Sequence, residues 1–309
     1  MLRGRRWLYW IFAAVIALGV AAMVMFCRRS KEPTVSSGSL ETYRDFVSQH
    51  VESRTVRVWL PDGYQRGDSC DVLYMHDGQM LFDSTATWNA QEWCVDEVMA
   101  TLIANHTLRP TIVVAIDNTG SRLEEYFPSG AAQYLSQSLR ESSKIDLSLG
   151  DNYLKFIVEE LKPFIDKEYR PLTSREHTFM AGSSMGGLIS LYALCEYPQV
   201  LGGVVCMSSH LNFEKLDGDD KAAAWAAAFR DYLSSHLPPA NSARVYMDRG
   251  TEDFDAGYRE AQKAVDSLFV AKGWDGDHFT SLVFMGHEHK ERFWAQRLSL
   301  ALRRVMAQD

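Results

Sequence analysis

The chain contains few cysteines, and none of them is placed as a metal or redox site requires. Five cysteines occur in 309 residues, and no two of them form a C-x-x-C pair. A zinc site or a dithiol redox centre is therefore not indicated. Cys195 and Cys206 lie in apolar runs and are expected to be buried thiols. Cys70 and Cys94 could form a disulfide if the domain lies outside the cytoplasm.

Positive charge is scarce beyond the N-terminus. The chain has 32 Lys and Arg residues against 40 Asp and Glu residues, which gives a formal net charge of −8. The first 31 positions hold six positive residues and no acidic one, so the rest of the chain is more negative still. Phosphate binding needs basic patches, and this acidic body therefore argues against nucleic acid as a partner. The chain also lacks internal repeats and low-complexity segments.

One long uncharged run lies near the N-terminus. Residues 7–26 carry no charge and are long enough to span a bilayer. We expect residues 1–31 to be a membrane anchor, residues 32–50 a tether, and residues 51–309 a single domain outside the cytoplasm. A cleavable signal peptide is the main alternative, although no clean A-x-A site follows the run. A lipoprotein with Cys27 as the lipidated residue is a third, although a bulky residue precedes that cysteine.

Strand-like and helix-like patterns alternate through the body. Apolar residues recur at helical spacing over 153–165, 225–233 and 294–305. Because strands alternate with helices of this length, we predict an α/β fold, a mostly parallel sheet with helices on both faces. The stretch 118–149 is expected to be a loop over the carboxyl edge of the sheet, where α/β proteins bind ligands. Seven strands are predicted, at 55–60, 71–75, 111–116, 177–181, 203–207, 244–247 and 280–284.

A glycine-flanked serine lies near the middle of the chain. Ser184 has Gly182 two positions before it and Gly186 two positions after it. Ser183 would need glycine at positions 181 and 185, which hold alanine and methionine. An apolar run precedes the motif and a helix-like run follows it, which is the strand–turn–helix context of a nucleophile elbow. The sequence therefore predicts Ser184 as a nucleophile presented at the carboxyl edge of the sheet.

Acidic and histidine side chains follow the serine in two later loops, each directly after a predicted strand. Glu252, Asp253 and Asp255 lie in the first loop, and His287 and His289 in the second. A serine hydroxyl needs a base to take its proton, and the base needs an acid to orient it. The chain order serine, acid, histidine is the one that accompanies the nucleophile elbow. A metal site at the two histidines is not favoured, because no third ligand of suitable spacing is visible.

Several motifs in this order resemble the putative-esterase (esterase D-like) family of α/β-hydrolases. That family includes feruloyl and acetylxylan esterases, S-formylglutathione hydrolases, siderophore esterases and mycolyltransferases. The resemblance spans roughly residues 50–305 and rests on the run 71–83 (DVLYMHDGQMLFD), the elbow, residues 250–253, and His289 with Trp294 five positions on. It implies an α/β-hydrolase fold, and the uncharged run 7–26 separately predicts an N-terminal transmembrane helix before that fold.

The resemblance also assigns roles to residues of this chain. It implies Ser184 as nucleophile and His289, rather than His287, as base. Asp253 is the best match for the acid, and Glu252 and Asp255 stay open as alternatives because members of the family differ over whether the acid is used at all.

An oxyanion hole for the acyl-transfer intermediate is also expected. The backbone N–H of Met185, directly after the nucleophile, is one expected donor. The resemblance implies the N–H of Gln79 as the other. Substrate contacts are proposed for His76, Arg122 and His210, although a structural role is the more expected one for both histidines. Trp88 and Trp93 suit either an aromatic platform or helix packing, and packing is favoured.

The sequence thus predicts a serine carboxylic-ester hydrolase that works through an acyl-enzyme and needs no cofactor or metal. The expected partner is a small-molecule or carbohydrate ester, either an acyl ester of a carbohydrate or a siderophore. An acyltransferase that uses the same site is one alternative. A non-catalytic binding protein on the same fold is another, because fold does not fix function.

Overall fold

A computed structural model describes residues 31–307 of the chain. The body forms one compact unit from Thr34 onward. The predicted membrane anchor lies almost entirely outside the described residues, so the anchor and the extracytoplasmic placement stay predictions. Among residues 31–307, no helix combines the length and the apolar character that a membrane span requires.

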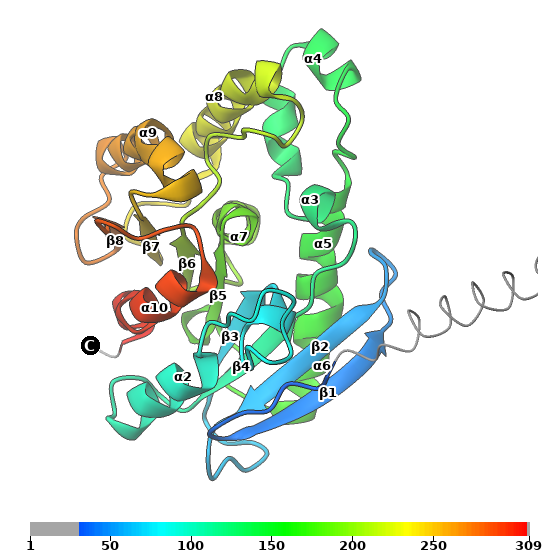
Figure 1. Ribbon diagram of the computed structural model, residues 1–309, viewed down its shortest axis with the longest axis vertical. Coiled ribbons are helices and arrows are strands. Elements are labelled where there is room, and N and C mark those ends of the chain that lie inside the picture. Colours follow the sequence, from blue (N-terminus) through cyan, green and yellow to red (C-terminus); the bar gives the residue numbers. More distant parts are fainter. Residues whose placement is uncertain (1–30, 308–309) are drawn as a thin grey trace, which may run out of the picture. The chain divides into compact units, whose positions relative to one another are not determined.

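The body is built on an eight-stranded sheet with the order β1-β2-β4-β3-β5-β6-β7-β8 (Figure 1). The pairs β1·β2 and β2·β4 are antiparallel, and the remaining pairs are parallel. The strands from β3 to β8 therefore end at one common edge. The bounds are β1 (Ser39–Phe46), β2 (Arg54–Leu60), β3 (Asp71–His76), β4 (Thr111–Ile116), β5 (Thr178–Ser183), β6 (Gly203–Met207), β7 (Arg244–Arg249) and β8 (Phe279–Val283).

Helices cover both faces of the sheet. On one face, α2 (Val95–Ala104) and α10 (Glu291–Met306) pack with one set of alternating strand residues. The opposite face is covered by α5 (Leu149–Lys155), the π-helical segment η3 (Phe156–Leu161), α6 (Lys162–Tyr169), α7 (Met185–Glu196), α8 (Asp219–His236) and α9 (Arg259–Ala271). The short helices are η1 (Gly78–Met80), α3 (Arg122–Glu125), η2 (Ser129–Tyr134), α4 (Gln137–Glu141), η4 (Arg175–His177) and η5 (Asp253–Tyr258).

The predicted α/β architecture is confirmed, and so are all seven predicted strands, within a few residues at their ends. One strand, β1, was not predicted. It lies inside the segment 32–50, which was predicted to be a tether. Its sequence, SLETYRDF, carries few apolar residues, since an edge strand leaves much of its length exposed. The tether prediction is therefore wrong beyond residue 38. The stretch 118–149, predicted as a loop, contains α3, η2 and α4.

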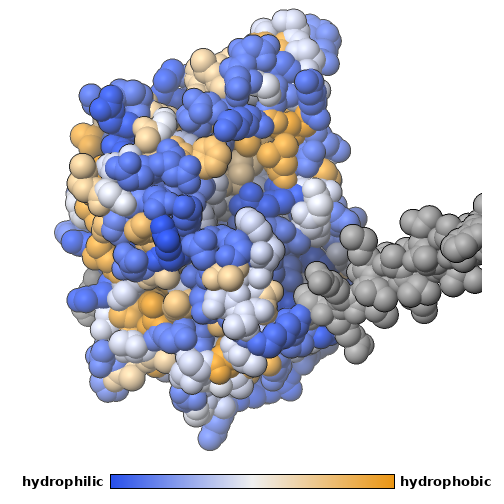
Figure 2. Space-filling view, in the orientation of Figure 1, coloured by the Kyte–Doolittle hydropathy of each residue, from blue (hydrophilic) through white to orange (hydrophobic). Residues whose placement is uncertain are grey.

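All four described cysteines are free thiols, so Cys70 and Cys94 are not paired. Cys195 and Cys206 are buried, as predicted. Hydrophilic residues cover most of the surface seen in Figure 2, and hydrophobic residues there form separate small groups. The large apolar side chains exposed within residues 31–307 are Val47, Trp88, Phe254, Val270, Val283 and Met285.

Candidate active site

The three loops predicted to carry catalytic groups all leave the same edge of the sheet. Ser184 follows β5, the acidic loop follows β7, and His289 follows β8. These strands run parallel with β6 between β5 and β7, so the loops emerge side by side. The topology thus brings together groups that lie more than a hundred residues apart in the chain.

Ser184 occupies the sharp turn between β5 and α7. Its backbone has φ 56° and ψ −122°, a strained conformation that is typical of a nucleophile elbow. The Ser184 amide donates to the carbonyl of Met207 at 2.9 Å, which ties the turn to the end of β6. A Cβ at Gly182 would lie 2.6 Å from the carbonyl carbon of Gly186, so the turn requires glycine there. The predicted elbow is therefore present in the structure.

A cavity of about 480 Å³ opens at this edge, and both Ser184 and His289 line it. Its lining comes from the loop after β3, the loop that leads to α2, residues at and before the start of α3, and residues at and before the start of α10. Other lining residues include Gln79, Trp88, Asn89, Gln91, Asn118, Arg122, Lys290 and Trp294. The serine and the histidine therefore share one solvent-accessible space, as acyl transfer requires.

His289 is held by a buried carboxylate. Its Nδ1 lies 2.6 Å from Oδ1 of Asp255, whose side chain is 0% exposed. Burial opposes ionisation of Asp255, but hydrogen bonds from His289, Ser208 and the Gly250 amide outweigh it and lower the carboxyl pKa. An ionised carboxylate only accepts hydrogen bonds, so Nδ1 carries the proton. The opposite ring nitrogen, Nε2, is then left free to accept a proton.

The predicted acid, Asp253, is therefore wrong as the partner of His289. Asp253 and Glu252 are exposed at the start of η5, whereas Asp255 is buried. Two positions along a 3₁₀ helix turn the side chain by about two thirds of a revolution, so Asp253 and Asp255 face different directions. The inward direction of Asp255 requires a close approach between its loop and the loop of His287. Glycine at position 250 allows this approach, since a Cβ there would lie 2.1 Å from the His287 carbonyl oxygen. Asp255, one of the two alternatives, is the residue that the geometry supports.

The two predicted oxyanion donors lie at helix starts. Met185 is the first residue of α7, and Gln79 belongs to the short helix η1. Amides in a first helical turn have no acceptor within their own helix, so they can bind a negatively charged oxygen. Gln79 also lines the cavity, and its Oε1 accepts from the Asn118 amide at 3.1 Å, which fixes the η1 loop.

The three proposed substrate contacts differ in their placement. Arg122 lines the cavity, and its guanidinium donates to both carboxylate oxygens of Asp77, at 2.6 and 2.8 Å. His76 is 1% exposed, and its Nδ1 lies 2.8 Å from the Tyr153 hydroxyl. His210 is 8% exposed and contacts the Tyr258 hydroxyl at 2.6 Å. Burial lowers the pKa of each histidine to about 4. Both side chains are buried and neither lines the cavity, so the geometry favours the structural role that was expected for them over contact with substrate.

Both tryptophans line the cavity, but they differ in how exposed they are. Trp93 is 3% exposed and packs against Trp294, with ring centroids 5.5 Å apart, as the packing alternative predicted. Trp88 is 84% exposed and lies at the cavity. Its loop is tied to the start of α10, because Asn89 donates to the Glu291 carboxylate at 2.9 Å.

Two residues next to the acid were missed by sequence reasoning. Ser208, directly after β6, donates to Oδ2 of Asp255 at 2.6 Å. Arg297, on α10, donates to the Ser208 hydroxyl oxygen at 2.9 Å and is 1% exposed. The available signal was an arginine next to the apolar stripe of a helix, three residues after Trp294, where a charge needs a buried partner.

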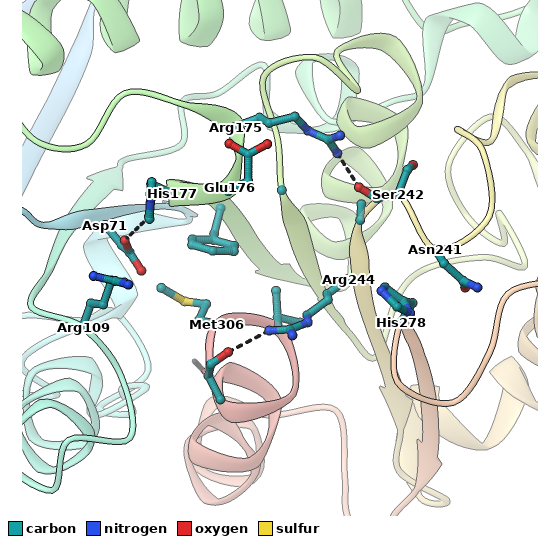
Figure 3. Close-up of a pocket in the computed structure, with 15 residues that line it drawn as sticks. Asp71, Arg109, Arg175, Glu176, His177, Asn241, Ser242, Arg244, His278 and Met306 are labelled. Atoms are coloured by element: carbon teal, nitrogen blue, oxygen red, sulfur yellow. Dashed lines mark hydrogen bonds and ion pairs between the residues drawn. The ribbon is translucent and has the colours of Figure 1, made fainter. Parts of the chain in front are cut away.

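A second cavity, of about 390 Å³, lies at the amino edge of the sheet (Figure 3). Arg175 donates to the carbonyls of Leu201 and Ser242, and Arg244 donates to that of Ala307. His177 pairs with a carboxylate at the start of β3. The basic groups of this second cavity are engaged in contacts within the protein that hold neighbouring segments together. We therefore place the active site in the cavity at the carboxyl edge, which contains Ser184 and His289. Within residues 31–307, no three His, Cys, Asp or Glu side chains are grouped as a metal site needs.

Comparison with known proteins agrees with this geometry. A model of the family described as "Putative esterase" matches residues 48–305. The uncharacterized protein YbbA of Bacillus subtilis (strain 168) is 24% identical over 264 residues, which cover 83% of this chain and 94% of that protein.

Solved structures are similar in fold. A ferulic acid esterase has a TM-score of 0.62 at 20% identity, covering 86% of this chain and 96% of that one. The enterobactin esterase FES from Shigella flexneri, solved in the presence of enterobactin, has a TM-score of 0.62 at 17% identity, covering 90% of this chain and 60% of that one.

Proposed function

We propose that this chain, which belongs to the putative-esterase family, hydrolyses carboxylic esters through an acyl-enzyme formed on Ser184. The observation that carries the proposal is the shared cavity of Ser184 and His289, together with the 2.6 Å contact from His289 to a buried, ionised Asp255. A serine at an elbow beside an oriented imidazole is the arrangement that acyl transfer uses.

In the proposed reaction, Nε2 of His289 takes the proton of Ser184 as the serine oxygen bonds to the ester carbonyl carbon. Asp255 stabilises the imidazolium that forms and keeps the ring in the tautomer with its proton on Nδ1. The imidazolium then protonates the alcohol oxygen as the ester bond breaks, which leaves the acyl group on Ser184. Water, deprotonated by the same imidazole, releases the acid and restores the serine.

The negative charge on the carbonyl oxygen is proposed to be stabilised by the N–H groups of Met185 and Gln79. Their support is positional, since one amide follows the nucleophile directly and the other belongs to a residue that lines the same cavity as Ser184. Fixed donors of this kind stabilise the transition state without reorganising during the reaction, and each contributes about 3 kcal/mol in well-studied hydrolases.

The proposal is tested with the purified protein and a panel of acetyl, butyryl and feruloyl esters, sugar esters and a siderophore lactone. We expect hydrolysis of at least one of them, with sensitivity to a fluorophosphonate. A folded protein that hydrolyses none of them and takes up no fluorophosphonate would contradict the proposal. Product analysis with added sugar acceptors would distinguish a hydrolase from an acyltransferase.

For the substrate, we propose an ester with an aromatic or sugar group near the reacting bond. The similar structures are a ferulic acid esterase and an enterobactin esterase, and in this chain an exposed indole, Trp88, lies at the cavity. A ring that is 84% exposed contributes little to the core, but it offers a flat face to a ligand.

Replacing this indole is expected to weaken binding without affecting folding. Trp88→Ala should raise KM for feruloyl or sugar esters by about 2- to 10-fold, with kcat and Tm nearly unchanged, because one aromatic contact contributes about 0.5–1.5 kcal/mol. Trp88→Phe, which keeps an aromatic ring, is the matched control, and its KM should lie between those of the wild type and Trp88→Ala. Steady-state kinetics check the prediction, and an unchanged KM on every substrate would remove Trp88 from the site.

A further inference from the structure

The hydroxyl group of Ser208 lies at the centre of a buried network behind the acid. Its oxygen is within hydrogen-bond distance of three groups: Nε1 of Trp294 at 3.0 Å, Nη2 of Arg297 at 2.9 Å and Oδ2 of Asp255 at 2.6 Å. The residue is 0% exposed, so water does not compete for these positions. Trp294 and Arg297 lie on α10 and Asp255 lies in η5, so all three partners are distant from Ser208 in sequence.

The chemistry of the three partners fixes where the hydroxyl proton lies. Indole and guanidinium N–H groups can only donate hydrogen bonds, so Ser208 must accept from both Trp294 and Arg297. A hydroxyl oxygen has two acceptor positions and one proton. With both acceptor positions occupied, the proton must go to Asp255, which is ionised and can only accept.

Arg297 is itself held in place, so the network cannot easily relax. Its Nη2 lies 3.2 Å from Oδ1 of Asp248, and both side chains are buried. The Tyr246 hydroxyl donates to the other oxygen of Asp248 at 2.9 Å. Burial raises the pKa of Asp248 to about 6, although Arg297 opposes that shift. Nε and Nη1 of Arg297 have no hydrogen-bond partner among residues 31–307, which leaves Nη2 as the nitrogen that carries the contacts.

The hydrogen bonds of this network fix which carboxylate oxygen of Asp255 points toward His289. Oδ2 accepts from Ser208 and from the Gly250 amide, the latter at 2.5 Å, while Oδ1 accepts from His289. Two donors on one oxygen prevent the carboxylate from rotating about its χ2 bond. The remaining oxygen is therefore kept toward Nδ1 of the imidazole.

We propose that Ser208 is a positioning residue for the His289–Asp255 pair, with its proton directed to the acid by Arg297 and Trp294. The proposal rests on the proposed ester hydrolysis, because the pair it orients is the base and acid of that reaction. The alternative is that Ser208 only satisfies buried donors and contributes to stability alone. Only the positioning role predicts that loss of the Ser208 hydroxyl lowers kcat and changes the NMR signal of the His289 Nδ1 proton.

The test compares Ser208→Gly with the matched control Ser209→Ala in the full chain. Ser208 has φ 44°, where glycine is favoured, so Ser208→Gly removes the hydroxyl while relieving backbone strain. Ser208→Cys keeps the shape of the side chain, with a larger sulfur atom in place of oxygen, but donates only weakly. Ser209 is also 0% exposed, and its hydroxyl has no hydrogen-bond partner among residues 31–307. The control therefore removes a neighbouring buried hydroxyl that lies outside the network.

We expect kcat to fall about 10- to 100-fold in Ser208→Gly with KM unchanged, because a hydrogen bond to a charged group is lost. Ser208→Cys should lie between Ser208→Gly and the wild type, and Ser209→Ala should match the wild type. The low-field proton NMR signal of His289 Nδ1–H, assigned by its loss in His289→Gln, should shift or broaden in Ser208→Gly and stay in place in Ser209→Ala.

Two results would overturn the proposal: a folded Ser208→Gly with wild-type kcat and an unmoved imidazole signal, or an equal loss of kcat in Ser209→Ala. If Ser208→Gly does not fold, Ser208→Cys gives the same comparison. The NMR signal does not depend on turnover. A wild-type protein that is inactive on all esters, but whose signal still responds to Ser208→Gly, would contradict the proposed function and not the positioning role.

Discussion

Ser184→Ala is expected to reduce ester hydrolysis by a factor on the order of 10⁶, the loss seen when a triad nucleophile is removed from another serine hydrolase. Without the hydroxyl, no acyl-enzyme can form, and the remaining donors and His289 can only assist direct attack by water. The side chain makes no capping hydrogen bond to α7, so Tm should change little. Steady-state kinetics on the best ester of the panel, with circular dichroism to check the fold, measure both quantities.

Ser183→Ala is the matched control for this substitution. It removes the other serine of the elbow, the one without glycines two positions away on either side, and should retain activity within about tenfold. Equal losses in the two variants would indicate a general disturbance of the turn. Unchanged turnover in Ser184→Ala would contradict Ser184 as the nucleophile.

Asp255→Asn is expected to lower kcat by a factor on the order of 10⁴, because an amide in place of the acid favours the wrong imidazole tautomer. The amide side chain can donate to Nδ1, which moves the imidazole proton to Nε2, the nitrogen that should accept from Ser184. The size of the side chain is preserved, so folding should be affected much less than catalysis.

Asp253→Asn, two positions earlier, provides the comparison. Asp253 is exposed at the start of η5 and is not bonded to His289, so its substitution should leave kcat within about twofold. Kinetics of the two variants on one substrate decide between the acids. A large loss in Asp253→Asn with normal turnover in Asp255→Asn would restore the acid that the sequence favoured.

The sheet and the order of the catalytic loops could be predicted because they depend on local patterns. The runs at 72–75 and 203–207 are continuously apolar, which is typical of parallel strands buried on both faces. The elbow was predictable because Gly182 is required by a close backbone approach to Gly186 within the turn itself. Each of these features depends on a short, continuous stretch of sequence.

The errors concern features that depend on distant contacts. The choice among Glu252, Asp253 and Asp255 is set by how η5 packs against the loop that carries His287, which a local pattern does not reveal. His76 is turned inward by Tyr153, a partner 77 positions away.

The strand β1 and the network behind the acid were missed for related reasons. β1 is an edge strand with a mainly polar sequence, so the register with β2 defines it and an apolar run does not. Ser208 and Arg297 meet across 89 positions, and neither belongs to a recognisable motif. Buried polar networks of this kind become visible only once the partners are placed in space.

The most direct test is to trap the acyl group, or a phosphonyl group in its place, on the nucleophile. The folded chain is incubated with a slowly hydrolysed ester or a fluorophosphonate, digested, and analysed by mass spectrometry. The account predicts one covalent adduct on Ser184 that is absent in Ser184→Ala and forms far more slowly in His289→Gln. Turnover of the same ester with no adduct on Ser184, or with an adduct on another residue, would contradict it.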